Sequence, residues 1–292
     1  MRRLPWLFLA ALALAAPPAG AQTRVPLPVV ASFSILGDFL REVGGDAVRV
    51  NILVGPDSDA HVYEPTPADA RKVSEAKLVF VNGLGFEGWL DRLVAAADAK
   101  SRIVVASAGI TPRKLDGGLD PHAWQDVANV RGYVENIRDA LKSADPERAP
   151  LYESRAAAYL AKLAELDKEI VSALAAIPNQ RRRIVSTHDA FGYFAVRYGL
   201  DFIAPQGVST DAEPSARDIA RIIDAARREK VAAIFLENIS DPRLAQRLAK
   251  ESGVTLGGEL YSDALSKPDG PAASYVAMMR HNVGELTKAL KP

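Results

Sequence analysis

The chain has 292 residues, 48% of them hydrophobic and 25% charged, which is the balance of a folded protein with one large domain or two moderate ones. Lysine plus arginine equals aspartate plus glutamate at 36 each, so electrostatics gives no support for a nucleic-acid partner. The absence of cysteine excludes disulfides and thiolate metal sites, which leaves imidazole and carboxylate as the strong metal ligands.

The N-terminal segment 1–21 has the features of a signal peptide. A basic start, MRR, precedes the short apolar run LPWLFLAALALAAPP, and the sequence AGA offers small residues for cleavage after Ala21. The apolar run is short for a membrane span, which disfavours an uncleaved anchor. Because no cysteine follows that could carry a lipid, we expect residues 22–292 to be secreted without a lipid anchor.

The next part of the chain, 22–145, alternates between strand-like and helix-like segments and is predicted to form an N-terminal α/β lobe. Strands are expected at 25–33, 48–54, 78–83 and 102–107, and helices at 35–44, 66–76, 86–97 and 127–144. Thr66 and Pro67 are typical of a helix start, as is Asp126. Strands that alternate with helices indicate a parallel sheet.

One long amphipathic helix is predicted at 147–177, within a linking segment of 146–178 that ends at Pro178. The alternation then restarts in a C-terminal α/β lobe, 179–292. Segments of strand or helix character follow at 183–188, 189–200, 201–207, 214–230, 231–238, 241–253, 255–261 and 271–290. The predicted fold class is therefore α/β, with two parallel-sheet lobes bridged by one long helix. A rigid bridge of this kind favours a limited hinge over a flexible linker.

Three of the four histidines lie in similar surroundings. His61 follows a strand in GPDSDAHVYEP, His122 precedes a helix in LDPHAW, and His188 ends the strand RIVSTH. The fourth, His281, lies inside a helix and is interpreted as a surface or packing residue. A single histidine is usually a structural, hydrogen-bonded group. Three near strand ends are more informative, since ligand sites of open α/β sheets collect there and histidine is the commonest metal ligand.

A carboxylate at a fourth strand end completes this set. Asp263 follows the strand-like segment GGELY, where it would otherwise be interpreted as a turn or cap residue. Three imidazoles and one carboxylate suit Zn²⁺, whereas oxygen-rich sites favour Mn²⁺ or Ca²⁺.

Several of these motifs resemble the zinc- and manganese-type periplasmic solute-binding proteins of ABC metal importers. The matching segments cover nearly all of the chain after the signal: the histidine of GPDSDAHVYEPTP, then DPHAWQD, STHDAFGYFAVRYGL and LYSDALS. The resemblance implies one metal ion per chain, held between two lobes by His61, His122, His188 and Asp263. It also implies a periplasmic monomer that delivers its cargo to an inner-membrane ABC permease, with a periplasmic metal donor as a further partner.

Two comparisons with the family refine the expected metal. Manganese-type members carry glutamate at the third position, where this chain has His188, so the resemblance points to zinc. Many zinc-type members have a histidine-rich loop before the second ligand, but the equivalent segment here, 111–120, is short and lacks histidine. Because Asp263 is present, we expect a closed site with four protein ligands.

Four acidic residues are candidates for orienting the imidazoles by hydrogen bonding: Glu64, Asp120, Asp189 and Glu237. Asp189 is also expected to begin the helix that follows His188. Binding should weaken as pH falls through the usual histidine range near 6.5.

Three alternative functions compete with zinc import. The first is manganese transport on the same fold. The second is a zinc hydrolase, which Asp263 disfavours because catalytic zinc keeps an open position and no HExxH motif is present. The third is an extracellular adhesion or structural module with incidental histidines, which predicts no stoichiometric metal.

Overall fold

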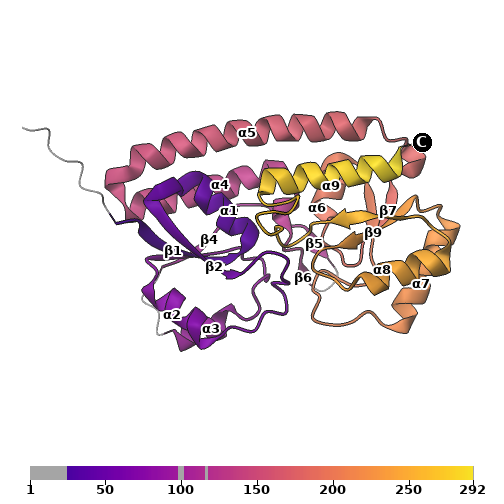
Figure 1. Ribbon diagram of the computed structural model, residues 1–292, viewed down its shortest axis with the longest axis horizontal. Coiled ribbons are helices and arrows are strands. Elements are labelled where there is room, and N and C mark those ends of the chain that lie inside the picture. The colour runs from indigo at the N-terminus through magenta and orange to yellow at the C-terminus, as the bar shows by residue number, and fades with distance from the viewer. Residues whose placement is uncertain (1–24, 98–101, 116–117, 292) are drawn as a thin grey trace, which may run out of the picture.

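Two parallel sheets form the centres of two lobes in the computed structural model, which describes residues 25–97, 102–115 and 118–291 (Figure 1). The predicted signal segment 1–21 lies outside these residues. The first lobe contains β1 (Leu27–Phe33), α1 (Ser34–Gly44), β2 (Val48–Val54), α2 (Pro67–Glu75), β3 (Leu78–Val81), α3 (Leu90–Ala96), β4 (Arg102–Val105) and α4 (Val127–Ala144). A small antiparallel hairpin, β5 (Lys114–Leu115) and β6 (Gly118–Leu119), precedes α4.

The second lobe repeats this alternation. It contains β7 (Arg183–Val185), α6 (Gly192–Tyr198), β8 (Asp201–Ile203), α7 (Ala216–Arg228), β9 (Ala233–Glu237), α8 (Pro242–Ser252), β10 (Leu256–Leu260) and α9 (Tyr275–Leu290). Short 3-10 turns lie at Gly45–Ala47, Ala123–Gln125, Pro146–Arg148 and Asn179–Arg181. The predicted α/β class with parallel sheets is confirmed.

The two sheets have the same topology. The strand orders are β2-β1-β3-β4 and β8-β7-β9-β10, so in each lobe the first strand lies between the second and the third. The chain therefore reverses direction across each sheet beside its first strand. In such sheets a crevice opens at the carboxyl ends of the strands on either side of this reversal.

The long helix α5 (Ala149–Ala175) spans both lobes, as predicted (Figure 1). Its buried residues recur every three or four positions, which makes one apolar stripe: Tyr152, Ala156, Tyr159, Leu163, Leu166, Ile170 and Leu174. This stripe packs against α1 and α4 of the first lobe and α9 of the second. Burial of each large apolar side chain contributes roughly 1.5–3 kcal/mol, so α5 joins the lobes through packing.

Local capping chemistry begins the helices where the sequence predicts it. Thr66 Oγ1 accepts a hydrogen bond from the Asp69 backbone N–H at 3.3 Å, and the Asp69 carboxylate accepts from the Thr66 N–H at 2.9 Å. Asp126 likewise accepts from the Ala128 N–H at 2.8 Å at the start of α4. Among the described helices, none is both long enough and apolar enough to cross a membrane.

The segment after His188 differs from the prediction. Helix α6 begins only at Gly192, and Asp189 lies before it rather than at its cap. Residues 188–189 instead pair with the neighbouring chain: His188 forms a bridge with Gln206, and the Asp189 N–H donates to the Gly207 carbonyl at 3.1 Å. These tertiary hydrogen bonds extend the β7 edge and delay the helix.

Candidate metal centre

His61 is positioned by the loop that leaves β2. Asp59 Oδ1 accepts a hydrogen bond from the His61 backbone N–H at 2.9 Å, which closes a tight Asx turn. The imidazole packs edge-on against Phe86, with ring centroids 4.8 Å apart. The loop therefore directs Nε2 of His61 inward, and only 9% of the residue remains exposed.

His122 is held on both its backbone and its ring by Asp120. Oδ1 of Asp120 accepts from the His122 N–H at 3.0 Å and lies 2.9 Å from Nδ1 of the ring. Asn82, just past β3, donates to the Pro121 carbonyl at 2.9 Å and ties this turn to the sheet. With Nδ1 engaged by a carboxylate, Nε2 is left as the metal-binding nitrogen of His122.

His188 lies beyond the end of β7 and is oriented by Glu237, the last residue of β9. Glu237 Oε1 accepts from the backbone N–H groups of Thr187 and His188, at 2.8 and 2.9 Å. Its Oε2 lies 2.7 Å from Nδ1 of His188, although the two atoms do not meet hydrogen-bond geometry. The Nε2 atom again faces the centre of the site.

Asp263 follows β10, but its loop is also held by the first lobe. Trp124 Nε1 and Gln125 Nε2 both donate to the Ser262 carbonyl, at 2.9 and 2.7 Å. The Leu265 N–H donates to Ser34 Oγ at 2.9 Å. Both lobes therefore fix the position of this carboxylate.

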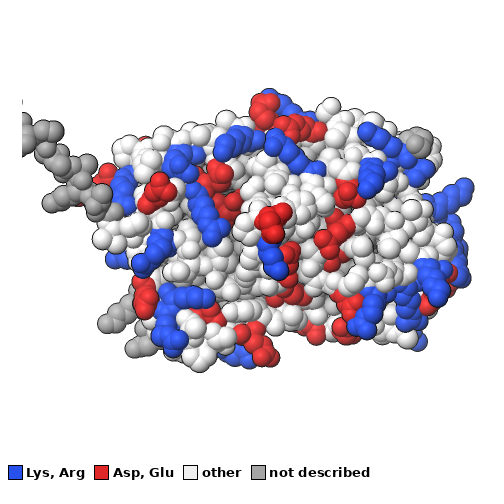
Figure 2. Space-filling model, in the orientation of Figure 1, with Lys and Arg blue, Asp and Glu red and all other residues white. Residues whose placement is uncertain are grey.

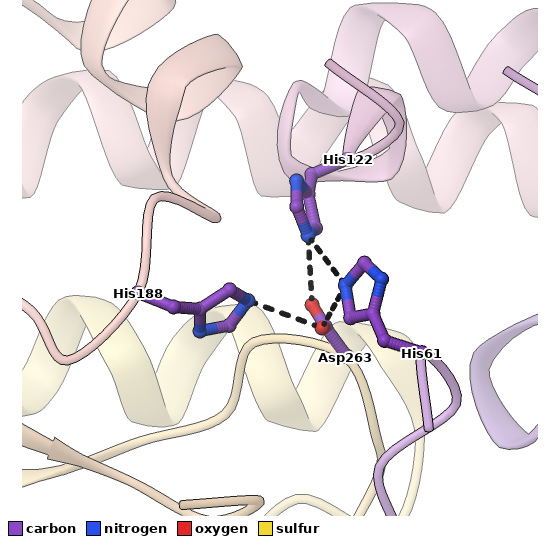
Figure 3. A group of neighbouring side chains, drawn as sticks. All are labelled: His61, His122, His188 and Asp263. Atoms are coloured by element: carbon purple, nitrogen blue, oxygen red, sulfur yellow. Dashed lines mark hydrogen bonds and ion pairs between the residues drawn. The ribbon is translucent and has the colours of Figure 1, made fainter. Parts of the chain in front are cut away.

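These four side chains converge on one buried point (Figure 3). Asp263 Oδ2 lies 3.2 Å from Nε2 of His61 and 3.2 Å from Nε2 of His188, and Oδ1 lies 3.5 Å from Nε2 of His122. The Nε2 atoms of His61 and His122 are 3.3 Å apart. Four ligands about 2.0–2.1 Å from a tetrahedral Zn²⁺ would lie about 3.3–3.4 Å from one another. The measured separations fit one small cation at the centre.

The polar atoms of the centre lack partners of their own. Within the described part of the chain, both oxygens of Asp263 and Nε2 of His188 are buried without a hydrogen bond. Buried polar atoms are normally paired, because an unpaired one costs roughly 1–3 kcal/mol. A carboxylate without donors that faces three imidazole nitrogens is a cation site in its chemistry.

The charges of the centre shift its proton affinities strongly. Burial alone would lower the pKa of His122, but the carboxylates of Asp263 and Asp120 outweigh it and raise this pKa to about 9. For His188, burial is likewise outweighed by Glu237 and Asp263, and its pKa lies well above the usual value. Burial would raise the pKa of Asp263, but the neighbouring His122 and His188 hold it well below its usual range. Protons and a metal cation therefore compete for the same nitrogens.

The four acidic residues that the sequence suggests as orienting groups lie in different places. Asp120 and Glu237 contact ligand imidazoles. Asp189 is partly buried nearby without a hydrogen bond to an imidazole among the described contacts, and burial and then Asp120 raise its pKa. Glu64 is exposed and lines a surface groove between α2 and α3.

Sequence reasoning missed the contribution of three other residues. Asp59 holds the backbone of His61, while Trp124 and Gln125 hold the loop of Asp263. An aspartate two positions before a ligand is a detectable signal for Asp59, since Asx turns have that spacing. The roles of Trp124 and Gln125 depend on a contact across more than 130 residues, which no local pattern indicates.

A cavity of about 140 Å³ reaches the centre beside His61. Its walls come from both lobes and include Phe86 and Pro121 from the first and Val208 and Asp211 from the second. This cavity is the approach to His61 along the boundary between the lobes.

Known proteins share this architecture. Residues 29–289 match the family described as "Zinc-uptake complex component A periplasmic". The chain is 38% identical over 265 residues to the manganese-binding lipoprotein MntA of Halalkalibacterium halodurans, covering 90% of this chain and 88% of the relative. It is 32% identical to the iron-binding protein YfeA of Yersinia pestis, covering 92% and 88%. The solved structure of the periplasmic zinc binding protein TroA from Treponema pallidum superposes with a TM-score of 0.88 at 30% identity, covering 91% of this chain and 99% of that one.

Proposed function

The chain belongs to the family of periplasmic zinc-uptake complex components, the metal-binding solute-binding proteins of ABC transporters, and on that premise we propose that its cargo is Zn²⁺. In this proposal one ion is captured between the lobes by His61, His122, His188 and Asp263 and is delivered to an ABC-type permease in the inner membrane. The convergence of these four buried, otherwise unpartnered side chains is the observation that carries it.

The division of the ligands between the lobes supports a carrier that also releases its cargo. His61 and His122 come from the first lobe, whereas His188 and Asp263 follow strands of the second. A displacement of the lobes would separate the ligands into two pairs, and neither pair alone completes a tetrahedral site. Contact with a permease that favours the separated state would thus lower the affinity for the ion.

Three imidazoles and one carboxylate favour zinc over manganese, because imidazole suits Zn²⁺ and oxygen ligands suit Mn²⁺. The family resemblance supports the same choice, since manganese-type members have glutamate where this chain has His188. Manganese is the second candidate, because MntA is named for manganese at 38% identity. YfeA is named for iron, and TroA for zinc.

We further propose that the protein is a carrier and no enzyme. Catalytic zinc normally keeps an open position for water, whereas Asp263 would fill the fourth position here. Figure 2 shows Lys and Arg interspersed with Asp and Glu on the viewed face, and the formal net charge of the chain is zero, so nucleic acid is not a proposed partner. The proposed state is a monomer that meets a permease and a periplasmic metal donor.

The proposed location is the periplasm, without a lipid anchor. MntA is named as a lipoprotein, which favours an anchor for that relative. This chain has no cysteine that could carry such a lipid. Phase partition of the protein expressed with its signal segment distinguishes the two: an anchored form would enter the detergent phase.

The test is metal content and competitive titration of residues 22–292 with Zn²⁺ and Mn²⁺. We expect one tightly held zinc per chain, lost on His188→Ala and retained on His281→Ala. His281 is the matched control, because it lies in α9 outside the centre and its Nε2 is 2.9 Å from the Glu259 carbonyl. Selective manganese uptake would overturn the zinc assignment while keeping the transport role. No tight metal would refute the proposal.

A further inference from the structure

Arg113 and Gly192 form a contact between the lobes that the ligand set does not include. Arg113 lies at the base of the β5–β6 hairpin, which stands between the two lobes (Figure 1). Gly192 is the first residue of α6, in the second lobe. The guanidinium of Arg113 occupies the space directly over Gly192.

Tyr193 joins the two sides of this contact. Its hydroxyl accepts a hydrogen bond from the Arg113 backbone N–H and donates to the Asp120 carbonyl, each at 2.9 Å. The Arg113 guanidinium carbon also lies 5.5 Å from the centre of the Tyr193 ring. The hairpin base is thereby attached to α6 through both its backbone and its side chain.

The same guanidinium reaches the metal centre through Asp120. Nη1 of Arg113 pairs with Oδ2 of Asp120, whose other oxygen, Oδ1, holds the backbone and ring of His122. Asp120 is fully buried, and a buried carboxylate needs a cation or several donors to stay in place. Arg113 supplies that charge at the position that keeps Oδ1 aligned with Nδ1 of His122.

Glycine at position 192 has no backbone explanation. Its φ is not in the left-handed region, and alanine is the better helix former by about 1 kcal/mol. A Cβ there would lie 1.3 Å from Nη1, 2.3 Å from Cζ and 2.7 Å from Nη2 of Arg113. The missing side chain thus makes room for the guanidinium.

We propose that Arg113, seated over Gly192, is a positioning residue that slows metal release by locking the lobes together and holding Asp120 against His122. This inference rests on the proposed zinc cargo. The contact couples one ligand of the first lobe to the helix that follows His188 in the second. Opening of the lobes must therefore withdraw Arg113 from its seat and loosen His122 in the same motion.

The test compares zinc dissociation into excess chelator for the parent, Gly192→Ala, Arg113→Gln and the double variant. Loss of a group that orients a metal ligand costs roughly 10- to 100-fold in affinity, so each single variant should release zinc about 10-fold faster or more. Because both substitutions remove the same contact, the double variant should be no faster than Arg113→Gln. The control is Gly284→Ala in α9, where a Cβ meets nothing within 4 Å.

A compensating variant separates direct contact from general damage to α6. Lysine keeps the positive charge but lacks the branched guanidinium, so Arg113→Lys should restore part of the slow release in the Gly192→Ala background. Amide hydrogen exchange of the metal-free protein supplies a second measurement. The Arg113 N–H, bonded to Tyr193, should exchange faster in Gly192→Ala than in the parent.

The outcomes separate this inference from the proposed function. If the parent binds zinc tightly and Gly192→Ala releases it at the parental rate, the role of Arg113 is wrong and the zinc cargo stands. Additive effects in the double variant, or no recovery with lysine, would likewise overturn the contact. If the parent takes up no zinc, the proposed function fails and the role in zinc retention fails with it.

Discussion

Replacement of Glu237 by glutamine should weaken zinc binding about 10- to 100-fold while it leaves the fold intact. Oε1 of Glu237 accepts from the Thr187 N–H at 2.8 Å, from the Thr187 hydroxyl at 2.6 Å and from the His188 N–H at 2.9 Å. A glutamine carbonyl can accept all three hydrogen bonds. The change therefore falls on the other oxygen, Oε2, which lies 2.7 Å from Nδ1 of His188.

The chemical effect of this substitution is a change of imidazole tautomer. Glu237 is ionised, because its contacts with His188 and Thr187 outweigh its burial and lower its pKa. A carboxylate favours a proton on Nδ1 and leaves Nε2 free for metal. A glutamine amide would instead donate to Nδ1 and favour a proton on Nε2, the atom that faces Asp263. A 10- to 100-fold loss of affinity corresponds to about 1.4–2.8 kcal/mol.

Competitive zinc titration and thermal unfolding of the metal-free protein measure the two parts of this prediction. Glu64→Gln is the matched control, because Glu64 is exposed on the surface and should leave zinc affinity unchanged. Glu237→Ala should differ from glutamine, since it strands three buried donors at roughly 1–3 kcal/mol each and lowers the free energy of unfolding. The reasoning is refuted if Glu237→Gln folds normally and binds zinc within about twofold of the parent, well short of the loss expected for an orienting group.

Three further predictions concern the centre and the core. Asp263→Ala should retain zinc more weakly than the parent, whereas His61→Ala should lose most affinity; equal binding by Asp263→Ala in the same titration would show that the carboxylate is no ligand. Zinc affinity should keep rising with pH up to about 9, because the raised pKa of His122 lets protons compete until then, and titrations across that range with a plateau already at neutral pH would contradict this. Burial of Asp38, beneath the Tyr275 N–H that it accepts at 2.9 Å, raises its pKa from 3.8 to about 6. Its contribution to stability is therefore present below the unfolded pKa and lost as pH rises through about 6, so Asp38→Asn should stabilise the metal-free protein by about 2–3 kcal/mol at neutral pH, and urea unfolding curves that show no such difference would contradict it.

Local sequence patterns were sufficient for the parts of the fold that local interactions determine. The cap at Thr66 and the apolar stripe of α5 involve residues a few positions apart, and the structure has both as predicted. The start of α6 was not predictable in this way. Hydrogen bonds from residues 188–189 to residues 206–207, on a separate segment, override the helical pattern after His188.

The orienting residues show the same limit more sharply. Glu64 and Glu237 are both acidic residues near a proposed ligand or a strand end, and the sequence offers no reason to separate them. The structure places Glu237 at 2.7 Å from His188 and Glu64 on the surface, because β9 lies beside β7 in the sheet. Strand order is a property of the whole lobe, so the distinction needs the tertiary structure.

By itself, the sequence determined the chemistry that is available to this protein: no thiolate, three imidazoles near strand ends, a carboxylate at a fourth, and two α/β halves joined by a long helix. Only the tertiary structure decided that these groups meet within 4.8 Å of one another and that Arg113 occupies the space over Gly192. The physical reason is range. Helix caps and apolar periodicity act over a few residues, whereas the metal centre is assembled from segments as much as 202 residues apart (His61 to Asp263), brought together by the packing of two sheets against one helix.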